Sequence, residues 1–119
     1  MRKLAVGYYR EGWPCGQCII KAADVKYHLG LDGELLKAVS AAGNGFGYGG
    51  LCAAAAAVIL LFGLIFDENT AKSLRIAFLE SFREKYCSFN CCAIAGDCES
   101  IVADAADIAD RLISAELGY

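Results

Sequence analysis

The sequence GNGFGYGGLCAAAAAVILLFGLIF, residues 43–66, decides how the rest of the chain folds. Its first part, residues 43–50, is rich in glycine, and glycine runs do not hold regular structure. Its second part, residues 52–66, is apolar, and alanine and leucine are strong helix formers. The stretch therefore predicts a glycine loop followed by a buried helix that starts at Cys52. Its sixteen apolar residues from Leu51 are fewer than the roughly 18 to 20 that a membrane span requires, so we expect a core helix and no span.

Bulk composition favours a single helical domain over residues 1–119. The chain has 57% hydrophobic residues and one proline, which is enough apolar material for a full core. Its net charge is −3 and its basic residues are scattered, so nucleic-acid binding is not expected. The apolar run after Met1-Arg2-Lys3 is too short for a signal peptide, and we expect a cytoplasmic protein. Seven cysteines, an odd number, then favour metal binding or reversible redox chemistry over static disulfides.

Helical spacing of apolar residues predicts four further helices. The first opens at Cys15 and ends at Gly30 as its left-handed cap, the second covers residues 33–42, the third follows the break at 67–70 and ends near Tyr86, and the last is capped by Asp97. Residues 1–13 show no clear period and predict an irregular N-terminal arm. Asp104, Asp107 and Asp110 are expected on a solvated face. The fold class is all-α, a bundle of about five helices.

The cysteines occupy related positions in this outline. Those expected in the first turn of a helix or of a short helical turn are Cys15, Cys18, Cys52, Cys91, Cys92 and Cys98, whereas Cys87 lies at a helix end. Backbone amides at helix N-termini stabilise thiolates and sulfide ligands, so converging helix starts would form one polythiol site. The spacing of Cys15 and Cys18 suits either a reversible disulfide or two ligands to one metal.

The glycine run satisfies the spacing of a dinucleotide-binding fingerprint, but neither a strand nor a parallel sheet surrounds it, so we reject that match. We expect Gly47, Gly49 and Gly50 to allow close backbone approach, either to another helix or to a cofactor held by the thiols. A plain connector is the alternative. His28 is expected as a surface or cap residue.

The order of the cysteine segments resembles the putative redox-active protein family named for its C_GCAxxG_C_C cysteine pattern. These segments are Cys18, a glycine-rich loop before Cys52, the run Ser88-Phe89-Asn90-Cys91, and Cys98 before a final helix rich in alanine and aspartate. The four defining cysteines of the family would fall on Cys18, Cys52, Cys91 and Cys98. The resemblance implies a small helical, redox-active protein without an assigned reaction or substrate.

Three functions remain open from the sequence. The favoured one is thiol–disulfide exchange or electron transfer through low-pKa cysteines, with a redox partner protein or small thiol; its candidates are Cys15, Cys18, Cys52, Cys91 and Cys98. The alternative is a metal or iron–sulfur carrier in which Cys18, Cys52, Cys91 and Cys98 are the ligands and loop amides donate to sulfur. A structural bundle with incidental cysteines is the third. The apolar composition also predicts a helix-packed homodimer.

Overall fold

The computed structural model describes residues 1–43, 45–90, 94 and 97–118. Its elements in chain order are α1 (Arg2–Arg10), α2 (Cys15–Tyr27), α3 (Glu34–Ala38), the π-helical turn η1 (Gly45–Gly49), α4 (Ala53–Ile65), α5 (Glu68–Tyr86) and α6 (Cys98–Leu117). Within the described residues the only strand-like pairing is an isolated bridge between Leu51 and Asn90. The predicted all-α class is therefore confirmed.

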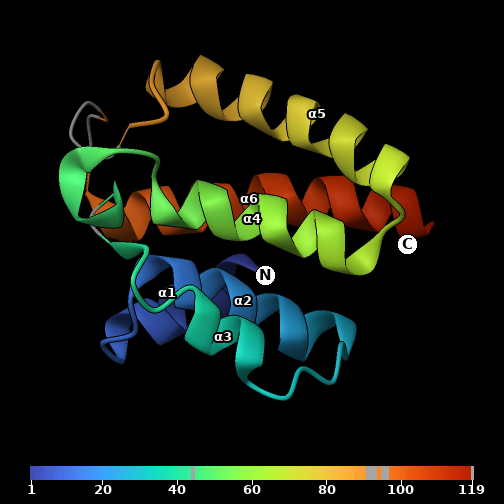
Figure 1. Cartoon of the computed structure of the whole chain (residues 1–119), viewed down its shortest axis with the longest axis horizontal. Helices are drawn as coiled ribbons and strands as arrows, with labels where there is room; N and C mark the ends of the chain where they lie inside the picture. The colour runs from blue at the N-terminus through green and yellow to red at the C-terminus, as the bar shows by residue number, and fades with distance from the viewer. Residues whose placement is uncertain (44, 91–93, 95–96, 119) are drawn as a thin grey trace.

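The long helices share one direction with a single exception. In Figure 1, α2, α4 and α6 begin on the left and run to the right, while α5 returns from right to left. The helix α4 packs against α2, α5 and α6, and α1 packs against α2 and α6. One end of the bundle therefore gathers the starts of α2, α4 and α6 together with the end of α5.

The core is centred on α4, as its composition predicts. Its alanines Ala54, Ala55 and Ala57 are fully buried, and their small side chains let three neighbouring helices approach closely. Phe62 of α4 meets Phe78 of α5 edge to face, with ring centroids 6.2 Å apart. Among the described residues, no helix is both long enough and apolar enough to cross a membrane.

Side-chain and left-handed caps fix the helix ends. The predicted cap at Asp97 is confirmed, because its carboxylate accepts a hydrogen bond of 2.8 Å from the backbone N–H of Ser100. The helix α2 ends at His28, which takes the left-handed conformation with φ of 53°, so the prediction that Gly30 is its cap is wrong. His28 is exposed, which agrees with its expected role at the surface as a cap.

The prediction of an irregular arm over residues 1–13 is wrong, because Arg2–Arg10 form α1. Ala5 is fully buried, and Leu4 and Tyr8 pack against the core on the same side. These positions lie at helical spacing, but Gly7 and the tyrosines at positions 8 and 9 make the apolar period hard to recognise in the sequence. Contacts with α2 and α6 stabilise a segment whose own periodicity is weak.

The helix predicted over residues 33–42 is shorter in the structure and ends at Ala38. Val39 and Ala42 are still buried, but they lie in turns after the helix. The expected stripe of buried residues therefore mixes one helical turn with a packed loop. Five-residue helices depend on tertiary packing because helix nucleation is costly.

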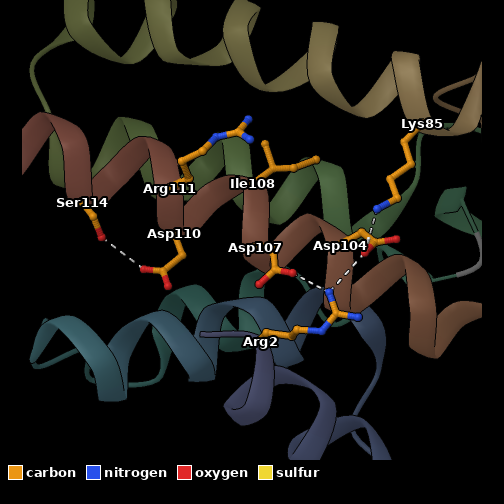
Figure 2. Close-up of a pocket in the computed structure, with 8 residues that line it drawn as sticks. All are labelled: Arg2, Lys85, Asp104, Asp107, Ile108, Asp110, Arg111 and Ser114. Carbon is orange, nitrogen blue, oxygen red and sulfur yellow. Dashed lines mark hydrogen bonds and ion pairs between the residues drawn. The ribbon is translucent and has the colours of Figure 1, made fainter.

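The acidic face of α6 also differs from the prediction. Asp104 and Asp110 are half-buried and hold basic and phenolic groups from α1, α2 and α5, whereas Asp107 is exposed and pairs with Arg2. Figure 2 shows these carboxylates in a shallow hollow of about 440 Å³, with Lys85 reaching toward Asp104. None of the residues that line this hollow is a cysteine. The acidic face therefore fastens helices together.

We expect Asp110→Asn to lower the free energy of unfolding by about 2 kcal/mol at pH 7, because a charged acceptor of several hydrogen bonds is lost. Burial opposes ionisation of Asp110, but hydrogen bonds from Lys26 and Tyr27 outweigh it and hold its pKa below the ordinary value. The stability that this lowered pKa supplies is present above the pKa of the unfolded chain, and it is lost as the pH falls through the folded-state pKa. Urea unfolding between pH 7 and pH 3 measures both effects.

Asp107→Asn is the matched control, because Asp107 is half exposed and solvent screens its ion pair with Arg2, so we expect little change in stability. The interpretation fails if the Asp110 variant and the wild type lose stability in parallel as the pH falls.

Candidate functional site

The described cysteines lie at the end of the bundle where three helices begin. Cys15 is the first residue of α2, Cys52 is the N-cap of α4, and Cys98 is the first residue of α6. Cys87 is the C-cap of α5, and the end of α5 lies at the same end of the molecule (Figure 1). The predicted positions at helix starts are therefore confirmed for Cys15, Cys52 and Cys98 and for Cys18, in the first turn of α2, and the predicted position of Cys87 at a helix end is confirmed too. Cys91 and Cys92 lie outside the described residues.

The starts of α2 and α4 touch at Gly16. A Cβ atom added at Gly16 would lie 3.2 Å from the backbone oxygen of Ala53, closer than ordinary van der Waals contact. The residue that follows Cys15 thus meets the residue that follows Cys52. Close approach was expected from the glycines of residues 43–50, but the structure shows it at Gly16. The signal in the sequence was a glycine, a poor helix former, in the first turn of a helix.

Cys52 is buried, and its backbone is tied to the segment that follows α5. The N–H of Cys52 donates a hydrogen bond of 2.8 Å to the carbonyl of Phe89, and Leu51 bridges to Asn90. Two stretches that are far apart in the sequence are therefore held side by side. The second of them leads directly to Cys91, which lies outside the described residues.

Cys15 and Cys18 differ in their surroundings. Cys15 is half-buried, whereas Cys18 is fully buried and its thiol donates to the carbonyl of Trp13 at 3.3 Å. Burial, followed by the nearby charge of Cys15, raises the pKa of Cys18 to about 11. A pKa lowered by the helix start was expected for this residue. That expectation is wrong because loss of hydration disfavours the thiolate more strongly than the helix favours it.

Cys98 faces the same region from α6. It is exposed, and Arg10 at the end of α1 binds the neighbouring Glu99 at 2.7 Å. Burial and then the negative charges of Cys98 and Cys15 raise the pKa of Tyr9. Tyr9 is therefore within electrostatic range of cysteines from the starts of α2 and α6.

The glycine run forms the turn η1 and displays two aromatic side chains. Phe46 and Gly47 have positive φ angles of 61° and 80°, and Phe46 and Tyr48 are 54% and 96% exposed. The N–H of Gly50 donates a hydrogen bond of 2.9 Å to the carbonyl of Gly45 inside the turn. Of the glycines expected to contact a cofactor, Gly50 therefore uses its amide internally, while the roles of Gly47 and Gly49 stay predictions.

A metal site requires several ligand side chains grouped around one position. In the described part of the chain, no three His, Cys, Asp or Glu side chains are grouped so that they could hold one ion. Cys91, one of the four expected ligands, falls outside that part. The three other expected ligands, Cys18, Cys52 and Cys98, do not make such a group by themselves.

The sequence matches a known family over most of its length. The model of the family described as "Putative redox-active protein (C_GCAxxG_C_C)" matches residues 13–112. The chain belongs to this family. Within this C_GCAxxG_C_C protein, the matched region contains every cysteine and starts at Trp13, the residue whose carbonyl accepts from Cys18. None of the curated proteins and none of the solved structures matches the chain significantly.

We expect Gly16→Val to lower the free energy of unfolding of the C_GCAxxG_C_C protein by about 2 kcal/mol, because the added side chain pushes α2 away from α4. Gly63→Ala is the matched control on the exposed side of α4, where an added Cβ meets nothing within 4 Å. It should raise stability by about 1 kcal/mol through helix propensity alone. Thermal and urea unfolding test both, and equal effects of the two variants would contradict the close contact.

Proposed function

We propose that this redox-active protein carries out thiol–disulfide exchange, with Cys15 as the attacking thiol and Cys18 as the resolving thiol. The observation that carries the proposal is their unequal burial at a helix start, since Cys15 is half-buried and Cys18 fully buried three residues later. Side chains three residues apart on a helix are neighbours, and a disulfide needs such proximity. An accessible thiol can meet a partner, while a buried one can react only within the chain.

The start of α2 favours a thiolate at Cys15. Its N-cap is Pro14, whose side chain makes no capping hydrogen bond to the first turn. The N–H groups of this turn and the positive end of the helix dipole therefore act on the first residue, Cys15, without competition from a capping side chain. This placement is the arrangement that activates cysteine nucleophiles.

Exchange proceeds in two steps that balance without a further reactant. The Cys15 thiolate attacks one sulfur of a partner disulfide, forms a mixed disulfide and expels the other partner sulfur as a thiolate. Cys18 then gives up its proton and attacks the sulfur of Cys15. The second partner sulfur leaves and takes this proton, so two electrons pass from the cysteine pair to the partner disulfide. A dithiol reductant regenerates the pair by the reverse route.

The buried Cys18 favours exchange over the four-thiolate carrier. Its sulfur donates a hydrogen bond to a backbone carbonyl, which is the behaviour of a neutral thiol, whereas metal ligation requires the thiolate. A chain that must be reduced after each cycle suits a reducing compartment, and we therefore propose the cytoplasm as its location. The homodimer stays a prediction, for which the exposed Leu60, Leu64 and Ile76 of α4 and α5 supply apolar surface.

The test uses the tryptic peptide of residues 11–21, which contains Cys15 and Cys18 and no other cysteine. Reduced protein is treated anaerobically with a small aromatic disulfide, alkylated and digested. We expect this peptide to lose two hydrogen atoms in the wild type and in Cys87→Ser, the matched control. Cys18→Ser should instead accumulate a mixed disulfide at Cys15, because nothing resolves it.

Two outcomes would contradict the exchange mechanism. One is a wild-type peptide whose two cysteines are both alkylated after oxidation. The other is iron or zinc in stoichiometric amounts in anaerobically purified protein, bound through Cys18, which would favour the carrier.

The raised pKa of Cys18 predicts the pH dependence of the second step. Only the thiolate attacks, and burial raises the pKa of Cys18, so decay of the mixed disulfide should accelerate by about tenfold per pH unit across neutral pH. Acid quenching followed by mass spectrometry measures this decay. A rate that is flat across neutral pH would show that Cys18 is already ionised.

A further inference from the structure

We propose that Lys21 is a positioning residue for this exchange, and that the rings of Tyr8 and Trp13 hold its ammonium group as the counter-charge of the Cys18 thiolate during the resolving step. The inference rests on the proposed function. It assigns a role to a residue that lies outside the cysteine pattern and that neither the composition nor the motif of the chain indicates.

The ammonium group of Lys21 is held by two aromatic rings. Its nitrogen lies 4.2 Å from the ring centre of Trp13 and 5.0 Å from that of Tyr8. These distances fall within the range of cation–π attraction. Tyr8 comes from α1 and Trp13 from the connection to α2, so two segments outside α2 fix the position of a long and otherwise mobile side chain.

The same segment holds Cys18. The carbonyl of Trp13 accepts the thiol of Cys18, while the ring of Trp13 carries Lys21. Lys21 follows Cys18 by three residues on α2, so both side chains lie on one face of the helix. Trp13 therefore contacts the thiol of Cys18 through its carbonyl and the ammonium group of Lys21 through its ring.

The resolving step needs this cation because Cys18 is shielded from water. Burial is the largest influence that raises the pKa of Cys18, and the charges of Cys15 and Glu11 add to it, while a backbone hydrogen bond and the charge of Lys21 lower it. When Cys15 enters the mixed disulfide its negative charge disappears, which leaves Glu11 and Lys21 as the two opposing charges. A thiolate that solvent cannot reach depends on fixed charges of this kind.

Lys21 differs from Lys26 on the same helix. Lys26 is bound by the carboxylate of Asp110 at 2.6 Å, which neutralises its charge. In the described part of the chain no carboxylate lies within ion-pair distance of Lys21. The faces of aromatic rings hold a cation without cancelling its charge, so the field of Lys21 remains available to Cys18.

The experiment follows the mixed disulfide at Cys15 after mixing the reduced full chain with the aromatic disulfide. Acid quenching at successive times and mass spectrometry of the peptide that carries both cysteines separate the first step from the resolving step. We expect Lys21→Met to slow the resolving step by about fivefold and to move its pH profile upward, while formation of the mixed disulfide changes by less than about twofold. Lys21→Arg should resolve within about twofold of the wild type, because it keeps the charge and the contact with the rings.

Two further variants separate charge from packing. Glu11→Gln should speed the resolving step, because it removes the charge that opposes Lys21. Tyr8→Leu keeps the charge of Lys21 but removes one of the rings that hold it, so a smaller slowing is expected. Lys72→Met on α5 is the matched surface control and should leave both steps unchanged.

The inference is overturned if Lys21→Met resolves at the wild-type rate with the same pH profile. It is also overturned if Lys21→Arg is as slow as Lys21→Met, since that result identifies a packing role. Failure of the proposed function looks different, because the wild-type protein itself would then form no Cys15–Cys18 disulfide.

Discussion

The contact between Gly16 and the backbone of Ala53 is the constraint on which the cysteine end of the bundle depends. The first turn of α2 lies directly on the first turn of α4, so that a Cβ atom at Gly16 would lie only 3.2 Å from the backbone oxygen of Ala53. The alanines of α4 extend this close packing along the helix, and α5 and α6 cover its other sides. Because the contact is between backbones, the positions of Cys15, Cys18 and Cys52 follow from the fold and do not depend on flexible side chains.

Electrostatic contacts along α6 connect it to α1, α2 and α5. Asp104 holds groups from α1 and α5, and Asp110 holds Lys26 and Tyr27 from α2. Each carboxylate is only partly exposed, so its bonds are less screened than those of a surface ion pair. These contacts orient α1, whose Tyr8 and Tyr9 then face the cysteine end. The carboxylates that connect the helices and the cysteines at one end of the bundle are thus separate sets of residues.

Burial decides the chemistry of the two cysteines of α2 more than helix position does. Both lie in the first turn of the helix, yet the hydrogen bond of Cys18 to Trp13 and its exclusion from water make it a neutral thiol at rest. In the proposed exchange, such a thiol would attack only the sulfur of Cys15 in a mixed disulfide. The different surroundings of the two cysteines arise within three residues of one helix and from one carbonyl group.

The sequence by itself determined the all-α class, the central apolar helix, the aspartate cap at the start of the last helix and the location of cysteines at helix starts, because these follow from local propensity and capping. Only the tertiary structure decided four other features. They are the helix α1, the hydrogen bonds and ion pairs of Asp104 and Asp110, the close approach at Gly16 and the raised pKa of Cys18. The first three depend on groups distant in the sequence, since Arg2 meets Asp104 and Gly16 meets Ala53, and the pKa of Cys18 depends chiefly on its burial. Local patterns carry no information on such pairs, and burial and charge are properties of the assembled neighbourhood.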